Sequence, residues 1–283
     1  MKFALCNEVL QPLPFERQCE LAAQLGYDAL EVAPFTLADD PLSISEAQAR
    51  QWRRTAADAG IAIGGLHWLL VAPAGLSIVS ADAALRARTA AVMERLVELC
   101  ALLGGRYLVH GSPKQRTPGP GDPPATVRER ALECFARAAR RAQACGVTYC
   151  IEPLAPRETG FVNTVAEAAE LVDTIGSPAL KTMLDCSAAG QAEREPVAAL
   201  LARWIPSGHV AHVQVNDPNR RGPGQGTMAF APIVRTLLQL QAQGQYRGIV
   251  AVEPFDYVPD GPGCAARAIG YLKGLVEAIG APR

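Results

Sequence analysis

Long apolar runs and an excess of charge of one sign are both missing from this chain of 283 residues. No stretch of the sequence approaches the roughly 18 continuous apolar residues that a membrane-spanning helix needs. The formal net charge is only -1, from 27 Lys+Arg against 28 Asp+Glu, so nothing predicts a basic surface for nucleic acid or an anionic membrane. We therefore expect a globular protein that binds neither membranes nor nucleic acids.

Signals of export and of structural zinc are missing as well. The chain has 8 cysteines, but no C-x-x-C pair occurs, and most lie in segments typical of strands or helices. We expect reduced, buried thiols, of which only Cys186 is notable because it follows a candidate site residue, Asp185. The apolar run in MKFALCNEVLQPLPF is too short for a secretory signal, so we expect a cytoplasmic protein.

What the sequence does contain is one unit repeated along its length: an apolar, β-branched segment followed by an Ala-, Leu- and Arg-rich segment. The predicted strands are KFALCNE, ALEVAP, AIGGLHW, YLVHGSP, TYCIEP, KTMLDC, VAHVQVND and GIVAVEPF. The predicted helices close with a glycine that suits a left-handed helix end: Gly26, Gly60, Gly104, Gly146, Gly176, Gly208 and Gly244.

Eight βα units without a break in composition predict an α/β fold, a single-domain (β/α)8 TIM barrel over residues 1–283. The competing doubly wound sheet would place a G-x-G-x-x-G turn after its first strand, and CNEVLQPLPF has none. In a TIM barrel the active site lies where the strands end. Polar residues stand at those ends here: Asn7, Glu8, Glu31, His67, His110, Ser112, Glu152, Asp185, Gln214 and Glu253.

The acids Glu152, Asp185 and Glu253 each follow an apolar stretch, and Gln214 follows another. Three buried carboxylates facing one another repel, and a divalent cation is the simplest remedy. Oxygen donors with one amide favour Mn²⁺ or Mg²⁺ over a structural Zn²⁺. The alternative is that Asp185 caps the next helix and the glutamates pair with Arg157 or Arg220.

Four segments, IEPLAPRETGFVNT, MLDCSAAG, HVQVNDPNRRGPGQG and VAVEPFDY, together resemble the xylose isomerase-like TIM barrels. The nearest members are the D-tagatose 3-epimerase-like and hydroxypyruvate isomerase-like sugar isomerases, and CNE and GLHW extend the resemblance over nearly the whole chain. It implies a divalent metal ion, Mn²⁺ or Mg²⁺ with Co²⁺ or Zn²⁺ as further options. It also implies a sugar or sugar-acid substrate and a homodimer or homotetramer.

The resemblance implies Glu152, Asp185, Gln214 and Glu253 as metal ligands, with Glu152 and Glu253 also as the catalytic proton-transfer pair. Gln214 stands where the ketose epimerases carry a histidine, but an H-x-Q pair is similar to that of the hydroxypyruvate isomerase-like members. His212 points to the same side of its strand as Gln214 but lies roughly 6.6 Å deeper. We therefore predict Gln214 as the ligand and His212 as a hydrogen-bonding or space-filling residue below it.

The resemblance also implies that Glu158 and Arg220 contact substrate. Ala188 replaces a substrate-binding histidine of the ketose epimerases, and His67 and His110 are the candidates to supply the lost contact. His212 is a further candidate to contact substrate, and each of the three histidines also has a purely structural interpretation. The segment GSPKQRTPGPGDPPATV is a candidate lid. Its Lys114 and Arg116, with Arg220 and Arg221, could bind a phosphate or carboxylate, but no glycine-rich phosphate loop is found, which favours an unphosphorylated substrate.

These features predict a metal-dependent sugar isomerase or epimerase that moves a proton through a metal-stabilised enediolate. The first alternative is a lyase or dehydratase on the same scaffold, acting on an inosose or another keto-sugar. The second is a carbohydrate-binding protein without activity, although three buried acids would then be an unneeded cost. A relative of endonuclease IV is disfavoured, because the chain has only 4 histidines and no basic excess.

Overall fold

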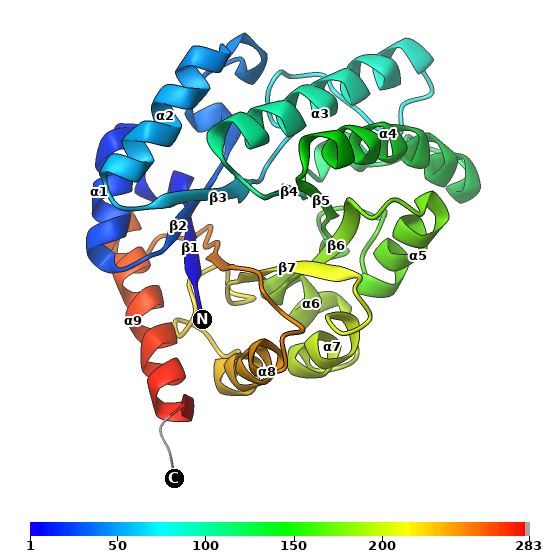
Figure 1. Cartoon of the computed structure of the whole chain (residues 1–283). Coiled ribbons are helices and arrows are strands. Elements are labelled where there is room, and N and C mark those ends of the chain that lie inside the picture. The colour runs from blue at the N-terminus through cyan, green and yellow to red at the C-terminus, as the bar shows by residue number, and fades with distance from the viewer. Residues whose placement is uncertain (281–283) are drawn as a thin grey trace.

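The computed structural model describes residues 1–280, and in this part of the chain all eight predicted strands are present. The strands are β1 (Phe3–Cys6), β2 (Ala29–Val32), β3 (Ala62–Leu66), β4 (Tyr107–His110), β5 (Thr148–Ile151), β6 (Leu180–Asp185), β7 (Val210–Val215) and β8 (Val250–Val252). All pair in parallel and in chain order, and β8 closes on β1. The predicted TIM barrel is confirmed (Figure 1).

Helices follow every strand and cover the outside of the barrel (Figure 1). They are α1 (Phe15–Leu25), α2 (Glu46–Asp58), α3 (Ala83–Leu103), α4 (Pro124–Cys145), α5 (Val165–Ile175), α6 (Cys186–Ala192), α7 (Val197–Trp204), α8 (Phe230–Ala242) and α9 (Gly261–Gly280). The seven glycines predicted to end helices all have positive φ, between 67° and 90°. This is the left-handed conformation that only glycine adopts without strain.

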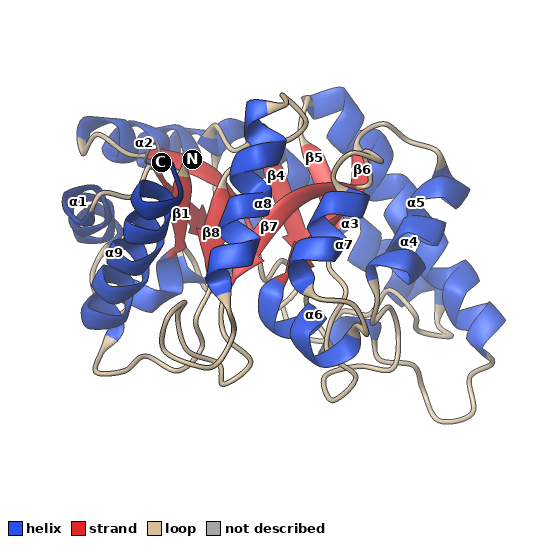
Figure 2. Ribbon diagram, turned by 90° about the horizontal axis from the view of Figure 1, so that it is seen from below, coloured by secondary structure: helices blue, strands red, loops and turns tan. Residues whose placement is uncertain are grey.

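The strands stop earlier than the apolar pattern predicts, so most of the polar residues at their ends lie in the following loops. Three of these connections contain short 3₁₀ helices: η1 (Asn7–Leu10) after β1, η2 (Pro34–Thr36) and η3 (Pro41–Ser43) after β2, and η4 (Lys114–Arg116) after β4. Long loops gather at the edge of the barrel opposite the two chain ends (Figure 2). That edge carries the strand ends and hence the predicted site.

Alternation of side chains along each strand divides the core in two. Outward-facing residues join the helices in one large apolar cluster. Inside the barrel, Tyr107, Val109, Cys150 and Met183 form one small cluster, and Ala4, Ala29 and Ala251 form another. The inward positions nearer the strand ends are polar, so the barrel is filled with apolar side chains at one end and carries a polar site at the other.

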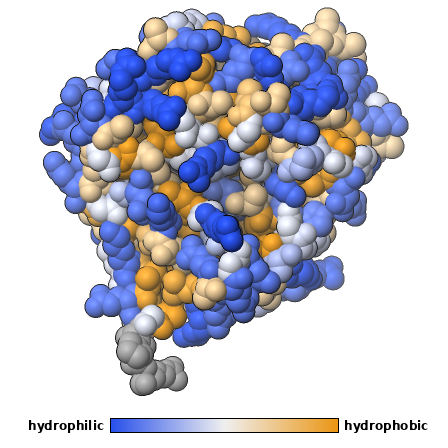
Figure 3. Space-filling model, in the orientation of Figure 1, coloured by the Kyte–Doolittle hydropathy of each residue, from blue (hydrophilic) through white to orange (hydrophobic). Residues whose placement is uncertain are grey.

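The remaining expectations from composition concern the surface and the thiols. All eight cysteines are free, and Cys145 is the one that is not buried. Among residues 1–280, no helix combines the length and apolarity needed to cross a membrane. Hydrophilic side chains are spread over the face seen in Figure 3 with hydrophobic ones scattered between them, and the exposed large hydrophobic residues are Val71 and Tyr271.

Candidate active site

Three carboxylates from separate strands meet where the barrel strands end. Glu152 directly follows β5, Asp185 is the last residue of β6, and Glu253 directly follows β8. One oxygen from each lies within 4.8 Å of the others, and their residues are only 6%, 5% and 2% exposed. The structure thus brings together the three acids that the sequence predicted.

Asp185 and Gln214 each have one buried oxygen atom without a hydrogen-bond partner. Asp185 caps α6, because its Oδ1 accepts a hydrogen bond from the backbone N–H of Ala188 at 2.6 Å, but its Oδ2 is unpartnered. The amide nitrogen of Gln214 donates to Glu31 Oε1 at 2.6 Å, and its Oε1 is unpartnered. Buried oxygens without partners are uncommon in native proteins. Both fit the role of donors to a cation.

The sequence offered the alternative that Asp185 caps a helix and that the glutamates pair with arginines, and only the first part of it is confirmed. Asp185 does cap the next helix, while among the described residues no ion pair joins Glu152 or Glu253 to Arg157 or Arg220. The capping oxygen and the unpartnered oxygen of Asp185 are different atoms, so capping does not exclude metal binding.

Burial, together with nearby carboxylate charges, raises the pKa values of the three acids. Burial, followed by the charges of Glu253 and Asp185, raises the pKa of Glu152 well above its usual value. Burial and then Glu253 raise that of Asp185 in the same way. Burial raises the pKa of Glu253 to about 7, even though His67 opposes the change. These shifts oppose the charged form of all three acids, and a divalent ion bound between them would favour it.

Glycine at position 111 makes room for one of these carboxylates. A Cβ atom on Gly111 would lie 1.7 Å from Oε2 of Glu152, so any side chain there would displace the acid. The donor set, with its free oxygens and its shaped space, fits an oxygen-ligated divalent cation.

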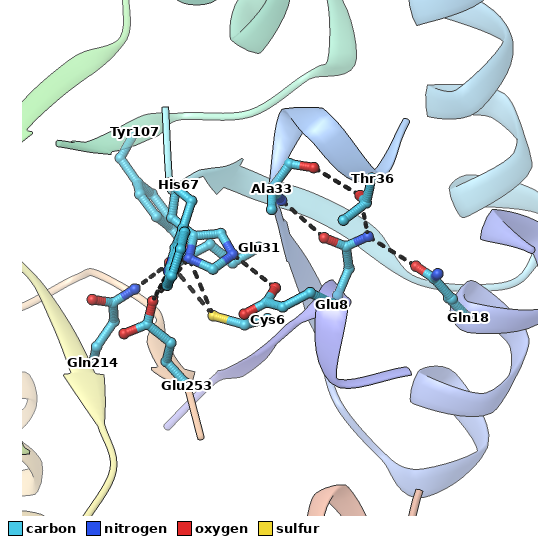
Figure 4. A network of polar contacts seen from close by, with 12 residues as sticks. Cys6, Glu8, Gln18, Glu31, Ala33, Thr36, His67, Tyr107, Gln214 and Glu253 are labelled. Atoms are coloured by element: carbon cyan, nitrogen blue, oxygen red, sulfur yellow. Dashed lines mark hydrogen bonds and ion pairs between the residues drawn. The ribbon is translucent and has the colours of Figure 1, made fainter. Parts of the chain in front are cut away.

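A second polar network lies deeper in the barrel and centres on Glu31 (Figure 4). Glu31 is fully buried; its Oε2 accepts from the hydroxyl of Tyr107 at 2.6 Å and lies 2.8 Å from Nε2 of His212. Burial alone would raise the pKa of Glu31, but His212, His67 and Tyr107 outweigh it and lower the pKa to about 2. His212 is thus in the deeper layer that the sequence predicted, stacked 4.0 Å from the ring of Tyr107. Enclosed in this way, it is not placed to contact substrate.

His67 also supports an acid. Its Nδ1 lies 2.9 Å from Glu253 Oε1 and its Nε2 lies 3.0 Å from Glu8 Oε2, and the side chain is fully buried. Although burial would lower the pKa of His67, Glu8 and Glu253 raise it well above its usual value. The expectation that His67 replaces a lost substrate contact is therefore not supported, because both ring nitrogens are already occupied.

A second group of side chains, Cys6, Glu8, His67 and Glu253, is also close enough to surround an ion. Its members are already paired with one another, and burial with the nearby carboxylate charges raises the pKa of the Cys6 thiol well above its usual value. A cation here would have to break the contacts of His67 with Glu8 and Glu253, and Glu8 Oε1 is the one unpartnered oxygen of this group. The other group has Asp185 Oδ2 unpartnered and Gln214 Oε1 unpartnered on the neighbouring strand, so it is the better candidate for a metal.

His110 lies outside the barrel, contrary to its prediction as a substrate contact. Its Nδ1 is 2.7 Å from the hydroxyl of Tyr149, and its ring meets the edge of Phe135 on α4. Burial, with the charge of Arg116, lowers its pKa to about 3, so it stays neutral. The physical reason is strand alternation, since Tyr107 and Val109 of β4 point into the barrel and His110 must then point out.

The mouth of the barrel holds the remaining predicted residues. Glu158 is exposed beside the turn after β5, where its carboxylate accepts from the N–H of Ala155. Arg220 is exposed with its guanidinium 5.2 Å from the ring of Phe255. Phe255 in turn lies 6.0 Å from Trp68. Both candidate substrate contacts are accessible, and neither touches the three acids directly.

Arg116 and Arg221, predicted to be available to an anionic substrate, are both used by the protein. Arg116 is fully buried and donates to the backbone carbonyl of Glu152 at 2.6 Å, which anchors the loop after β4 to the end of β5. Arg221 pairs with Asp256 at 3.0 Å. Lys114 remains exposed.

Sequence reasoning missed the contacts that three residues make around the site; Asn216 was predicted only to touch substrate or to begin the turn after β7. Glu31 was recognised only as a polar strand end, although its position in ALEVAP marks it as an acid in an apolar strand. Trp68 donates its indole N–H to Glu253 Oε1 at 3.1 Å, and its φ of 51° is unusual for a bulky residue. Asn216 accepts from the N–H of Ser187 and donates to the carbonyl of Glu253, so it ties β6 to β8. No sequence signal identified these contacts.

The thiol at the site is also a different one from that expected. Cys186 is buried in the outer apolar cluster, whereas Cys6 lies 3.7 Å from Glu31 Oε1 and 3.8 Å from His67 Nδ1.

Comparisons with known proteins point to one family. The sequence profile of the xylose isomerase-like TIM barrel family matches residues 19–275. A D-psicose 3-epimerase of Agrobacterium fabrum is 30% identical over 243 residues, which span 83% of this chain and 78% of the relative. A D-psicose 3-epimerase of Ruminiclostridium cellulolyticum is 28% identical over 247 residues, with 83% and 76% coverage. These relatives are sugar epimerases.

Solved structures agree on the fold. A D-psicose 3-epimerase determined in the presence of D-fructose superimposes with a TM-score of 0.80 at 24% identity, covering 98% of this chain and 99% of that chain. An L-ribulose 3-epimerase gives a TM-score of 0.81 at 21% identity, with coverage of 99% and 96%. At these identities the likeness extends to the fold alone.

Proposed function

Because the chain belongs to the xylose isomerase-like TIM barrel family, we propose that it is a divalent-metal-dependent sugar epimerase or isomerase acting on a ketose or sugar acid. The observation that carries the proposal is the group of Glu152, Asp185 and Glu253, buried with ligand atoms within 4.8 Å of one another. Buried like charges at this spacing destabilise the fold unless a cation binds between them. The ketose 3-epimerase relatives favour a sugar substrate.

The metal ligands in this proposal are Glu152, Asp185, Gln214 and Glu253. Their donors are all oxygen atoms, which favours Mn²⁺ or Mg²⁺, with Co²⁺ or Zn²⁺ as further options. A divalent ion bound there acidifies the C–H group beside a chelated carbonyl and stabilises the negative charge that develops on oxygen.

Glu152 and Glu253 are the proposed proton-transfer pair. They come from β5 and β8, which are not neighbours in the barrel, so they can approach a substrate from different sides. One carboxylate removes the proton from the carbon beside the carbonyl, and the other delivers a proton to the opposite face of that carbon, which inverts it. Return of the proton to the adjacent carbon would instead interconvert a ketose and an aldose.

The residues at the mouth of the barrel favour a carbohydrate substrate bound next to the three acids. Arg220 and Glu158 are exposed and can bind hydroxyl groups, while Trp68 and Phe255, both partly exposed, offer aromatic surface for the C–H faces of a sugar. Trp68 reaches Glu253 through its indole N–H, so a substrate held at the acids would lie against its ring.

A panel of ketoses and sugar acids incubated in D₂O with Mn²⁺ tests the proposal. We expect deuterium to enter the carbon beside the carbonyl, an epimer or isomer to form, and EDTA to abolish both. The labelled carbon would identify the reaction. Loss of water or of an aglycone would instead assign the lyase alternative, and no exchange together with no chelator-sensitive change in melting temperature would leave a carbohydrate-binding protein.

A further inference from the structure

The inference starts from how tightly Glu31 is held inside the barrel. Its side chain has no exposure, and its Oε2 accepts from the Tyr107 hydroxyl at 2.6 Å and lies 2.8 Å from His212 Nε2. Gly65 makes this possible, because a Cβ there would lie 2.5 Å from the backbone oxygen of Tyr107 and 2.6 Å from its ring. With one oxygen held, the other oxygen of Glu31 has little freedom to move.

That other oxygen decides how the amide of Gln214 is turned. Oε1 of Glu31 accepts from Nε2 of Gln214 at 2.6 Å. Oε2 of Glu31 already accepts from Tyr107, and Oε1, an acceptor as well, can pair only with the NH₂ end of an amide. Reversing the amide would set two oxygen atoms against each other in a buried site and leave both without a donor, which is unfavourable.

The carbonyl oxygen of Gln214 must therefore face away from Glu31, as Figure 4 shows. It is buried without a partner, and Gln214 pairs in register with Asp185 on the neighbouring strand. An amide that turned its NH₂ group toward a cation could not bind it, because only the oxygen is a donor to metal ions.

We propose that Glu31 is a positioning residue: it fixes the amide of Gln214 so that its carbonyl oxygen completes the cation site formed with Glu152, Asp185 and Glu253. This inference rests on the proposed metal-dependent function. Its consequence is that cation affinity depends on a residue that is not itself a ligand.

Calorimetric titration of Mn²⁺ into the metal-free protein provides the first test, with Glu31→Gln as the variant. The single oxygen of the new amide cannot serve Gln214 and the Tyr107–His212 pair together, so the Gln214 amide loses its fixed orientation. We expect the Mn²⁺ dissociation constant to rise about 10–100-fold, the range for loss of a residue that supports metal ligands. Tyr149→Phe, which deletes a buried hydroxyl contact with His110, is the matched control and should lower stability without changing the affinity.

A reciprocal exchange in the metal-free protein tests whether Glu31 and Gln214 support each other through their direct contact. Gln214→Glu alone places two carboxylates at the 2.6 Å contact, so its melting temperature should fall. In the double variant Glu31→Gln/Gln214→Glu, the amide at position 31 donates a hydrogen bond to the carboxylate at position 214. The contact is restored with its direction reversed, so most of the decrease in melting temperature should be recovered. No recovery in the double variant would overturn the proposal.

The outcomes distinguish this inference from the function on which it rests. A wild-type chain that binds no Mn²⁺ would overturn both. Wild-type binding together with an unchanged dissociation constant in Glu31→Gln would overturn only the positioning role, and the proposed metal site would stand.

Discussion

Each of the three acids at the strand ends is held by a different neighbour. Glu253 is fixed by His67 and Trp68, whose nitrogens lie 2.9 Å and 3.1 Å from the same oxygen. Asp185 is fixed by the start of α6, and the carboxylate of Glu152 lies against Gly111. The hydrogen bonds to Glu253 and Asp185 limit how far these two acids can move apart, which preorganises them for the proposed cation.

At this scale we predict that Glu152→Gln and Glu253→Gln each lower the turnover number about 10²–10⁴-fold, the usual contribution of a general acid or base. Glutamine cannot carry the proton, so turnover should fall. It keeps an oxygen donor in the same place, so folding should be retained. The measurement is the rate of deuterium exchange into substrate, with circular dichroism as the check on folding. Glu129→Gln, an exposed acid on α4, is the control and should exchange at the wild-type rate. Normal exchange in either site variant would contradict the assigned role.

At the scale of elements, the end of β6 and the start of α6 share one side chain. Asp185 uses Oδ1 as the N-cap of α6 and leaves Oδ2 free toward the other acids. Asn216 adds a second tie, because it joins the N–H of Ser187 in α6 to the carbonyl of Glu253 after β8. The start of α6 and the proposed metal site therefore depend on the same few contacts.

We predict different effects for two substitutions at this junction. Asp185→Asn keeps a good N-cap and removes a crowded charge, so without metal it should be at least as stable as the wild type. Asp185→Ala loses the cap and should be about 1 kcal/mol less stable than Asp185→Asn. Both should lose most of the affinity for Mn²⁺. Chemical denaturation and metal titration measure the two effects, and wild-type Mn²⁺ affinity in Asp185→Asn would remove Asp185 from the ligand set.

For the whole molecule, the raised pKa values link stability to pH. An acid whose pKa is higher in the folded chain binds its proton more tightly there, so it stabilises the fold most at low pH. For Glu253, whose pKa rises from 4.5 to about 7, this contribution is lost as the pH increases through that interval. Glu152 and Asp185 shift in the same direction and extend the effect.

A divalent cation should reverse this trend, because it binds the deprotonated acids. We predict that the increase in melting temperature produced by Mn²⁺ is small near pH 5 and grows by several degrees toward pH 8. Differential scanning calorimetry with Mn²⁺ and with EDTA measures it. The same experiment on Asp185→Asn should show little increase at either pH. An Mn²⁺ effect independent of pH would mean that the ion binds elsewhere.

Prediction from sequence succeeded where the signal was local. The strands, the helix-ending glycines and the three acids could be read from short segments, because alternation and apolar runs are properties of neighbouring residues. His110 shows the limit: its place at a strand end was correct, but β4 ends after a stretch in which Tyr107 and Val109 face inward, so His110 faces the helices. The direction of a side chain at a strand end depends on register, and the sequence did not specify it.

By itself, then, the amino-acid sequence determined the barrel, its single domain and the acids Glu152, Asp185 and Glu253 at its rim, because each follows from a pattern within one βα unit. The tertiary structure alone decided how those acids are supported. Glu31 and Gln214 are 183 positions apart in the chain, and His67 and Glu253 are 186 apart. Closure of the barrel brings these strands together, so hydrogen bonds across its interior have no counterpart in any local pattern.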